Sequence, residues 1–285
     1  MSERKAIFYV VLSSLIWSTS FPAVKLGLGF FPPVVFVFLR FSLGFVIYLL
    51  FFLVTKSSFP LNLFREKNAY ALGLVTFLSY IFQFWGQKYT LASRTALIIN
   101  LFVVWVPFLA IFFLKEKPKI NYLFSLVLLI PGMVLLTVGR NIKEALSRGI
   151  MVGDLMVLGA SFCWAFYVII SKKLLERFST HEINMFVFLV TAVLSLPLVA
   201  IEGFKITLDL RGFAIVFYLA FACTVLAYYL YVTGLKHSGA IKSTIFVSLE
   251  VFFSFIVSLI FLGERWTGIE LLGGFLMLVA VLISF

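Results

Sequence analysis

Two charged side chains lie deep inside long apolar stretches of the chain, Glu250 and Arg40. At about 1.5 Å per helical residue, they sit roughly 15 Å and 12 Å from the nearest stretch ends. An ionisable group in such surroundings is costly and is a functional candidate by default. Glu250 is a candidate to bind a ligand or to exchange a proton; a buried ion pair or a protonated carboxyl are the structural alternatives. Arg40 is its candidate charge partner, with a ligand carboxylate or backbone carbonyls as the other options.

A stripe of polar side chains provides the second group of candidates. Spacings of four, three and four put four polar residues on one face of a predicted helix: Thr76, Tyr80, Gln83 and Gln87. Tyr228 and Tyr231 repeat the pattern later in the chain. We take Tyr80, Gln83, Tyr228 and Tyr231 as ligand-binding candidates, with hydrogen bonding between helices as the alternative.

Four further candidates lie in the middle of apolar stretches. Trp17 and Trp164 are far from the stretch ends, where tryptophan usually acts as an interfacial anchor. Their rings are suited to stacking on an apolar or cationic ligand, or to packing between helices. Asn100 and Ser248 lie at similar depths in two other stretches. They are candidates to line the same site.

The elements that must position these residues are membrane-spanning helices. The chain has 285 residues, of which 63% are hydrophobic and 12% charged, against about 45–50% and 25% in soluble domains. This composition excludes a soluble enzyme and a nucleic-acid binder, and the net charge of +11 reflects Lys and Arg in short linkers. We predict ten helices, at 6–26, 32–55, 69–88, 92–114, 119–138, 150–172, 181–201, 212–236, 240–262 and 267–284.

An internal repeat relates the two halves of the chain. Trp17 and Lys25 match Trp164 and Lys172 at one interval, and later pairs match at an interval one residue longer: Thr76 with Thr224, Tyr80 with Tyr228, and Asn100 with Ser248. With five spans in each half, the second copy must cross the membrane in the opposite sense. The predicted fold is therefore all-α and membrane-integral, with ten helices in two inverted five-helix repeats at residues 1–139 and 150–285. Inverted repeats are typical of alternating-access transporters.

Several short motifs resemble the EamA-like family of the drug/metabolite transporter superfamily. They are Ile16-Trp17-Ser18-Thr19-Ser20-Phe21, Leu39-Arg40-Phe41, Leu114-Lys115-Glu116-Lys117 and Gly153-Asp154-Leu155. The resemblance implies a central cavity lined mainly by helices 1, 3, 4, 6, 8 and 9. It also implies small metabolites such as amino acids as substrates, usually exported.

We therefore predict a secondary transporter of the cell membrane that exports small organic metabolites and has both termini in the cytoplasm. It is driven by the substrate gradient or by a proton. A channel, or a membrane-embedded enzyme acting on a lipid-linked substrate, is the alternative. The expected partners are the small-molecule substrate and membrane lipid, without nucleic acid, in a monomer or a homodimer. The two histidines and two cysteines give no metal pattern, and no cofactor is expected.

Overall fold

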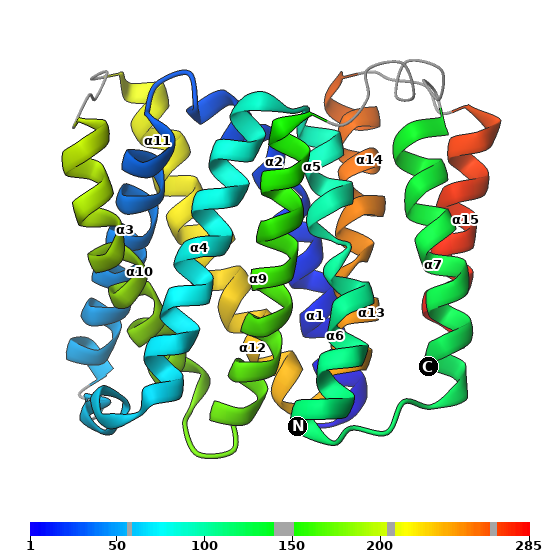
Figure 1. The fold of residues 1–285 in the computed structure, drawn as a ribbon, viewed down its shortest axis with the longest axis horizontal. Helices are drawn as coiled ribbons and strands as arrows, with labels where there is room; N and C mark the ends of the chain where they lie inside the picture. Colours follow the sequence, from blue (N-terminus) through cyan, green and yellow to red (C-terminus); the bar gives the residue numbers. More distant parts are fainter. Residues whose placement is uncertain (56–58, 140–150, 204–208, 263–266) are drawn as a thin grey trace.

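The computed structural model describes residues 1–55, 59–139, 151–203, 209–262 and 267–285. Within these residues every regular element is helical, and the helices run side by side between two ends of the molecule (Figure 1). Nine helical segments of the described chain are long and apolar enough to cross a membrane. The all-α membrane fold is thus confirmed. The tenth segment, α15, has 16 residues and is shorter than a typical span, so the number ten stays a prediction.

Each predicted apolar stretch corresponds to one helix or to a consecutive run of helices, and the short helix η1 lies between two of the stretches. In chain order they are α1 (Glu3–Ser18), α2 (Ser20–Gly27), α3 (Pro33–Thr55), η1 (Leu61–Arg65), α4 (Lys67–Tyr89), α5 (Ala92–Ile99), α6 (Phe102–Leu109), η2 (Ala110–Leu114), α7 (Ile120–Val138), α9 (Val152–Leu174), α10 (Thr180–Glu202), α11 (Leu210–Tyr218), η4 (Leu219–Leu226), α12 (Ala227–Ser238), α13 (Ala240–Val247), α14 (Leu249–Leu262) and α15 (Gly268–Ile283).

Three of the predicted continuous helices are interrupted near their middle. The breaks lie at Thr19 between α1 and α2, at Asn100–Leu101 between α5 and α6, and at Ser248 between α13 and α14. The ψ angles of Thr19, Asn100 and Ser248 are −13°, −5° and −9°. At each break, hydrogen bonds between residues three apart replace some of the α-helical bonds between residues four apart. An example is the bond from Leu101 N to Ile98 O at 3.1 Å. Short 3₁₀ stretches inside a helix often mark a hinge.

The predicted helix at 212–236 contains a π-helical segment, η4, between α11 and α12. The Thr224 hydroxyl donates to the carbonyl of Leu219, five residues earlier, at 2.9 Å. A π turn holds one residue more than an α turn, and such turns are frequent at functional sites. The Cys223 carbonyl in this segment accepts hydrogen bonds from outside the helix.

Glycines allow very close helix contacts, and two of these contacts join the two halves of the chain. α4 packs on α9 where Gly86 meets Gly153, and a Cβ on Gly153 would lie 2.5 Å from the Gly86 carbonyl oxygen. α7 packs on α15 where Gly132 meets Gly273. Gly273 therefore serves packing within the chain.

Two lysines that the repeat relates bind the last carbonyls of two helices. Lys25 Nζ donates to the carbonyls of Gln87 and Thr90 at 2.7 and 2.8 Å, at the end of α4. Lys172 Nζ donates in the same way to Leu235 and Lys236, at 3.0 and 2.9 Å, at the end of α12. A cation stabilises the negative end of a helix dipole.

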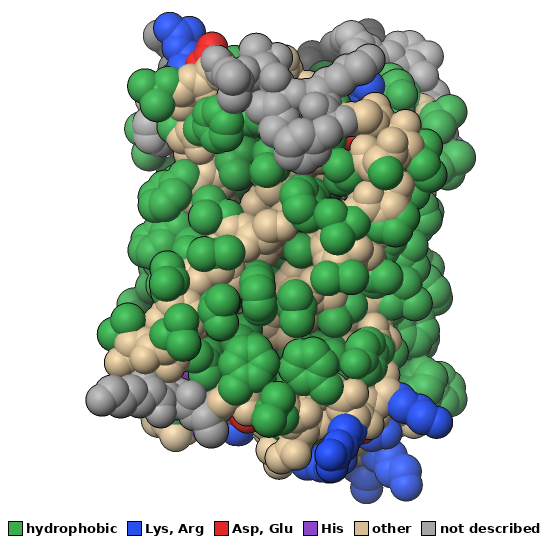
Figure 2. All heavy atoms as spheres, turned by 90° about the vertical axis from the view of Figure 1, so that its left-hand side faces the viewer, with side chains coloured by type: hydrophobic (Ala, Val, Ile, Leu, Met, Phe, Trp, Pro, Cys, Tyr) green, Lys and Arg blue, Asp and Glu red, His purple; other side chains and the backbone are tan. Residues whose placement is uncertain are grey.

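The surface suits a lipid environment. Figure 2 shows hydrophobic side chains over the middle of one face, with Lys and Arg at its two ends. The chain ends lie toward the same end of the bundle (Figure 1), where the ring of Phe285 packs on Phe246 of α13 at 5.0 Å.

Candidate functional site

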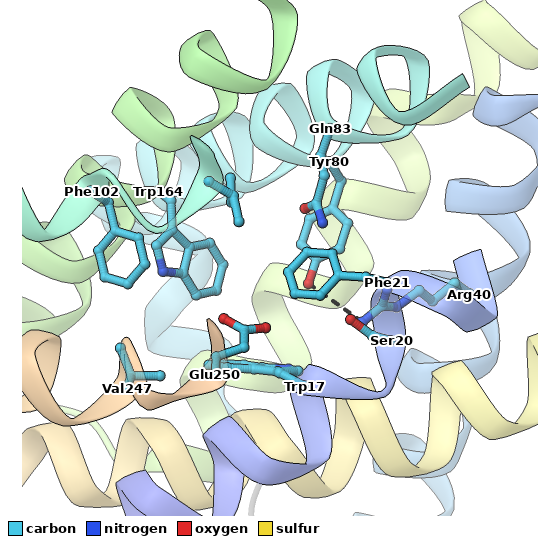
Figure 3. A pocket seen from close by; sticks show the side chains of 11 residues that line it. Trp17, Ser20, Phe21, Arg40, Tyr80, Gln83, Phe102, Trp164, Val247 and Glu250 are labelled. Carbon is cyan, nitrogen blue, oxygen red and sulfur yellow. Dashed lines mark hydrogen bonds between the residues drawn. The ribbon is translucent and has the colours of Figure 1, made fainter. Parts of the chain in front are cut away.

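A small cavity lies where the interrupted helices meet. Its lining comes from both halves of the chain: Trp17, Ser20, Phe21, Arg40, Tyr80, Gln83, Ile99, Phe102, Trp164, Val247 and Glu250 (Figure 3). The cavity has a volume of about 40 Å³, enough for a few water molecules. Pockets that hold drug-sized ligands are much larger, roughly 300–1,000 Å³. The lining includes residues next to all three helix breaks.

Glu250 supplies a carboxyl group to the cavity. It lies in the first turn of α14, two residues after the break at Ser248, and its side chain is buried. The carboxylate points into the cavity (Figure 3). One of its oxygens accepts a hydrogen bond from Asn100 Nδ2 at 3.2 Å. The two helix breaks that the repeat relates are thus joined by a hydrogen bond from Asn100 to Glu250.

Arg40 supplies the positive charge, and α4 and the π segment hold it in place. Its Nε donates to Thr224 Oγ1 at 2.6 Å, and its Nη2 donates to the Cys223 carbonyl at 3.1 Å. The guanidinium lies over the Tyr80 ring, 4.9 Å from the centroid. These partners are neutral, and among the described residues Arg40 makes no ion pair with Glu250. The guanidinium and the Glu250 carboxyl group therefore face one cavity without direct contact.

An aromatic cluster packs against the cavity. Trp17 lies edge-on to Trp164 and Tyr228, with ring centroids 5.6 and 5.5 Å apart, and packs on Tyr231 at 5.2 Å. Trp164 stacks on Tyr167 at 4.5 Å. Trp17 Nε1 donates to the Cys223 carbonyl at 2.8 Å, which ties α1 to the π segment. The cluster forms a packed wall in which both halves of the chain take part.

The predicted site residues divide into two groups. Six line the cavity: Trp17, Arg40, Tyr80, Gln83, Trp164 and Glu250. The other four lie behind the lining and are fully buried: Asn100, Tyr228, Tyr231 and Ser248. Tyr228 donates to the Tyr80 hydroxyl at 3.0 Å, and the Ser248 hydroxyl donates to the Ile245 carbonyl at 2.7 Å. The helix at 210–238 thus supports Arg40 and Tyr80 and contributes no lining side chain, whereas the helix at 33–55 contributes Arg40.

Five lining residues were not among the predicted ones: Ser20, Phe21, Ile99, Phe102 and Val247. Four of them are apolar, so sequence alone does not distinguish them from lipid-facing residues. Their common feature is a position within two residues of a helix break. Within the described residues no group of three or more His, Cys, Asp or Glu side chains is arranged to hold a metal ion.

Comparison with known proteins gives the family. Residues 4–138 and 151–285 each match the model of the EamA-like transporter family. An uncharacterized transporter of Archaeoglobus fulgidus is 26% identical over 99% of this chain and 98% of its own length. A probable amino-acid metabolite efflux pump of Salmonella typhimurium is also 26% identical, over 99% of this chain and 95% of its own length.

The fold has a match among solved structures. One crystal structure superposes with a TM-score of 0.84 at 17% sequence identity, covering 99% of this chain and 97% of the other. The family and the named relatives are transporters and not enzymes. The chain therefore belongs to the EamA-like transporter family.

Proposed function

We propose that this protein exports small organic metabolites, amino acids or similar solutes, across the cell membrane by alternating access. The observation that carries the proposal is the position of the cavity. It lies beside three helix breaks, and both halves of the chain line it. Broken helices near the middle of the bilayer are the usual setting of a transporter's substrate site.

The charges and rings of the cavity support a small zwitterionic substrate. Arg40 offers a donor for a carboxylate, and Glu250 offers an acceptor for an ammonium group. Phe21, Phe102 and Trp164 provide apolar walls for a side chain. Two relatives, from Salmonella typhimurium and Escherichia coli, are named probable amino-acid metabolite efflux pumps.

Two inverted repeats, at 1–139 and 150–285, are part of the proposal. In Figure 1, α1 starts at the end that holds the N-terminus, whereas α9 starts at the opposite end. Lys25 and Lys172 have equivalent roles at the ends of α4 and α12. With both termini in the cytoplasm, the end that holds them faces the cytoplasm.

The driving force is either the substrate gradient or a proton carried by Glu250. The Glu250 carboxylate faces the cavity, where a proton and an ammonium group would compete for it. Competition of this kind couples the two movements, because release of one ligand favours uptake of the other.

Transport in proteoliposomes tests the proposal. Vesicles loaded with unlabelled amino acids should accumulate external radiolabelled amino acid by counterflow, and the flux should saturate. If a proton drives transport, an imposed pH gradient should drive uphill movement in the wild type. In Glu250→Gln, counterflow should persist while the pH gradient loses its effect, if Glu250 carries the proton.

The matched control is Glu66→Gln, the same chemical change at a surface residue paired with Arg177; it should leave both activities unchanged. Flux that does not saturate, or that lacks counterflow, would indicate a channel. Absence of flux for every amino acid and organic solute tested would reject the proposed function.

A further inference from the structure

Two ion pairs stand at opposite ends of the bundle. Arg94 Nη2 lies 2.8 Å from Asp154 Oδ2, and Lys242 Nζ lies 2.7 Å from Glu3 Oε1. The first pair joins the start of α5 to the start of α9, and the second joins the start of α13 to the start of α1. In Figure 1, α5 and the start of α9 lie at the end opposite the N-terminus, and the start of α13 lies near it.

The two pairs have matching places in the two halves. Arg94 and Lys242 are separated by the same interval as Asn100 and Ser248. Each basic residue lies in the first turn of its helix and reaches the first helix of the other half. Each pair therefore fastens one half of the chain to the other, at one end only.

Both basic residues lie on short helices that end at a break beside the cavity. α5 ends before Asn100–Leu101, and α13 ends before Ser248. Ile99 and Val247, the last residues of these two helices, line the cavity. A swing of either helix about its break would move one wall of the cavity. The ion pair at the far end of the same helix opposes that swing.

We propose that Arg94–Asp154 and Glu3–Lys242 are the two gate latches of the transport cycle, each closing the cavity toward its own end of the molecule. The inference rests on the proposed transport function. Opening toward the N-terminal end breaks Glu3–Lys242 while Arg94–Asp154 stays closed, and opening toward the other end does the reverse. Both latches are formed in this structure, which agrees with the small volume of the cavity.

The surroundings of the pairs determine which partner can be removed cleanly. Asp154 also accepts hydrogen bonds from Thr90 Oγ1 at 2.6 Å and from the Met151 backbone at 3.0 Å, so loss of Arg94 does not leave it unsatisfied. Glu3 is 56% exposed, and water solvates it when Lys242 is removed. Removing Glu3 instead would leave the buried Lys242 without its carboxylate. The basic residue is therefore the one to replace at each end.

The test measures access to the cavity from each side of the membrane. A reporter cysteine, Gln83→Cys, is placed in the full-length protein after the native Cys163 and Cys223 are replaced by alanine. The reporter is labelled in proteoliposomes of known orientation with a membrane-impermeant maleimide. Arg94→Met should speed labelling from the end opposite the N-terminus about fivefold or more, and Lys242→Met should do so from the N-terminal end.

Two controls test whether these particular pairs are responsible. Arg177–Glu66 is also an ion pair between the halves, at 2.8 Å, but neither residue lies on an interrupted helix. Arg177→Met should leave both labelling rates unchanged. Arg94→Lys keeps the charge and should restore the slow wild-type rate. If Gln83→Cys does not fold, Ser20→Cys provides a second reporter in the same cavity.

The latch proposal fails if both methionine variants change labelling from the same side, or if neither changes it. Wild-type counterflow with amino acids is measured in parallel. Counterflow together with unchanged labelling would reject the latches alone. If no flux is found but the two methionine variants speed labelling from opposite ends, the transport function is rejected. The proposal that each ion pair closes the cavity toward its own end then still holds.

Discussion

At the scale of single residues, the main feature of the site is a buried arginine held by neutral partners. Arg40 is 2% exposed and bonds to a hydroxyl and a backbone carbonyl rather than to a carboxylate. A close ion pair would cancel its field, whereas neutral acceptors leave most of it in place. The cavity therefore retains a positive side at Arg40 and a carboxyl group at Glu250.

Arg40→Lys should destabilise the protein even though it keeps the charge. The ammonium group of lysine cannot reproduce the fixed fork that reaches both Thr224 and Cys223. Loss of one hydrogen bond to a charged group costs about 1.5–3 kcal/mol. Thermal unfolding in detergent should show a lower Tm, while Arg177→Lys, at an exposed position, should not change it. An unchanged Tm for Arg40→Lys would mean that these bonds contribute little.

At the scale of helices, closely packed helix pairs lie beside helices that are interrupted. The Gly86–Gly153 and Gly132–Gly273 contacts bring backbones together, so α4 with α9 and α7 with α15 form tight pairs. The breaks at Asn100–Leu101 and Ser248 lie on other helices. Tight pairs with hinged helices beside them are an arrangement suited to movement of a few segments against a fixed frame.

Gly273→Ala should separate α15 from α7. The added Cβ would lie 2.5 Å from the Leu136 backbone nitrogen and 2.8 Å from the Gly132 carbonyl oxygen, and backbone atoms cannot move aside cheaply. Overpacking of this kind costs about 1–3 kcal/mol. The measurement is again the Tm in detergent. Gly268→Ala, in the same helix with nothing within 4 Å of the added Cβ, is the matched control and should be neutral. Equal Tm values for both variants would contradict this contact.

At the scale of the whole molecule, composition and periodicity were enough to predict the membrane fold, because a span must be apolar along its whole length. The spacing of the polar stripe put Tyr80 and Gln83 on one helix face, and both side chains line the cavity. Tyr228 and Tyr231 share that spacing but lie behind the lining. Their depth depends on the π segment and on the packing of neighbouring helices, which spacing along one helix does not encode.

The helix breaks could not be predicted from the sequence, for a similar reason. Asn100 and Ser248 were identified as candidates, but a polar residue inside an apolar stretch is compatible with a continuous helix. The break depends on which neighbouring groups satisfy the freed backbone atoms. Phe102 and Val247, which line the cavity, each lie directly beside one of these breaks.

Reporter fusions test the arrangement in the membrane. In a Gram-negative host, a green fluorescent protein after Phe285 should fluoresce, and alkaline phosphatase should be active after Gly203 but inactive after Arg177. A phosphatase fused after Thr267 should be active, which tests whether α15 crosses the bilayer. Fluorescence with fusions at both Thr267 and Phe285 would mean that α15 does not cross, and would overturn the ten-span topology.

The π segment also limits how far the two halves are interchangeable. Before it, Trp17 and Lys25 match Trp164 and Lys172 at one interval, and from Thr224 onward the matches fall one residue later. One residue turns an α-helix by about 100°. A chimera that grafts α4 in place of the helix at 210–238 would therefore lose the carbonyl that Arg40 and Trp17 share, unless the transplanted segment gained a residue at the same turn. The two halves of the chain are in this way parts that cannot be exchanged for each other.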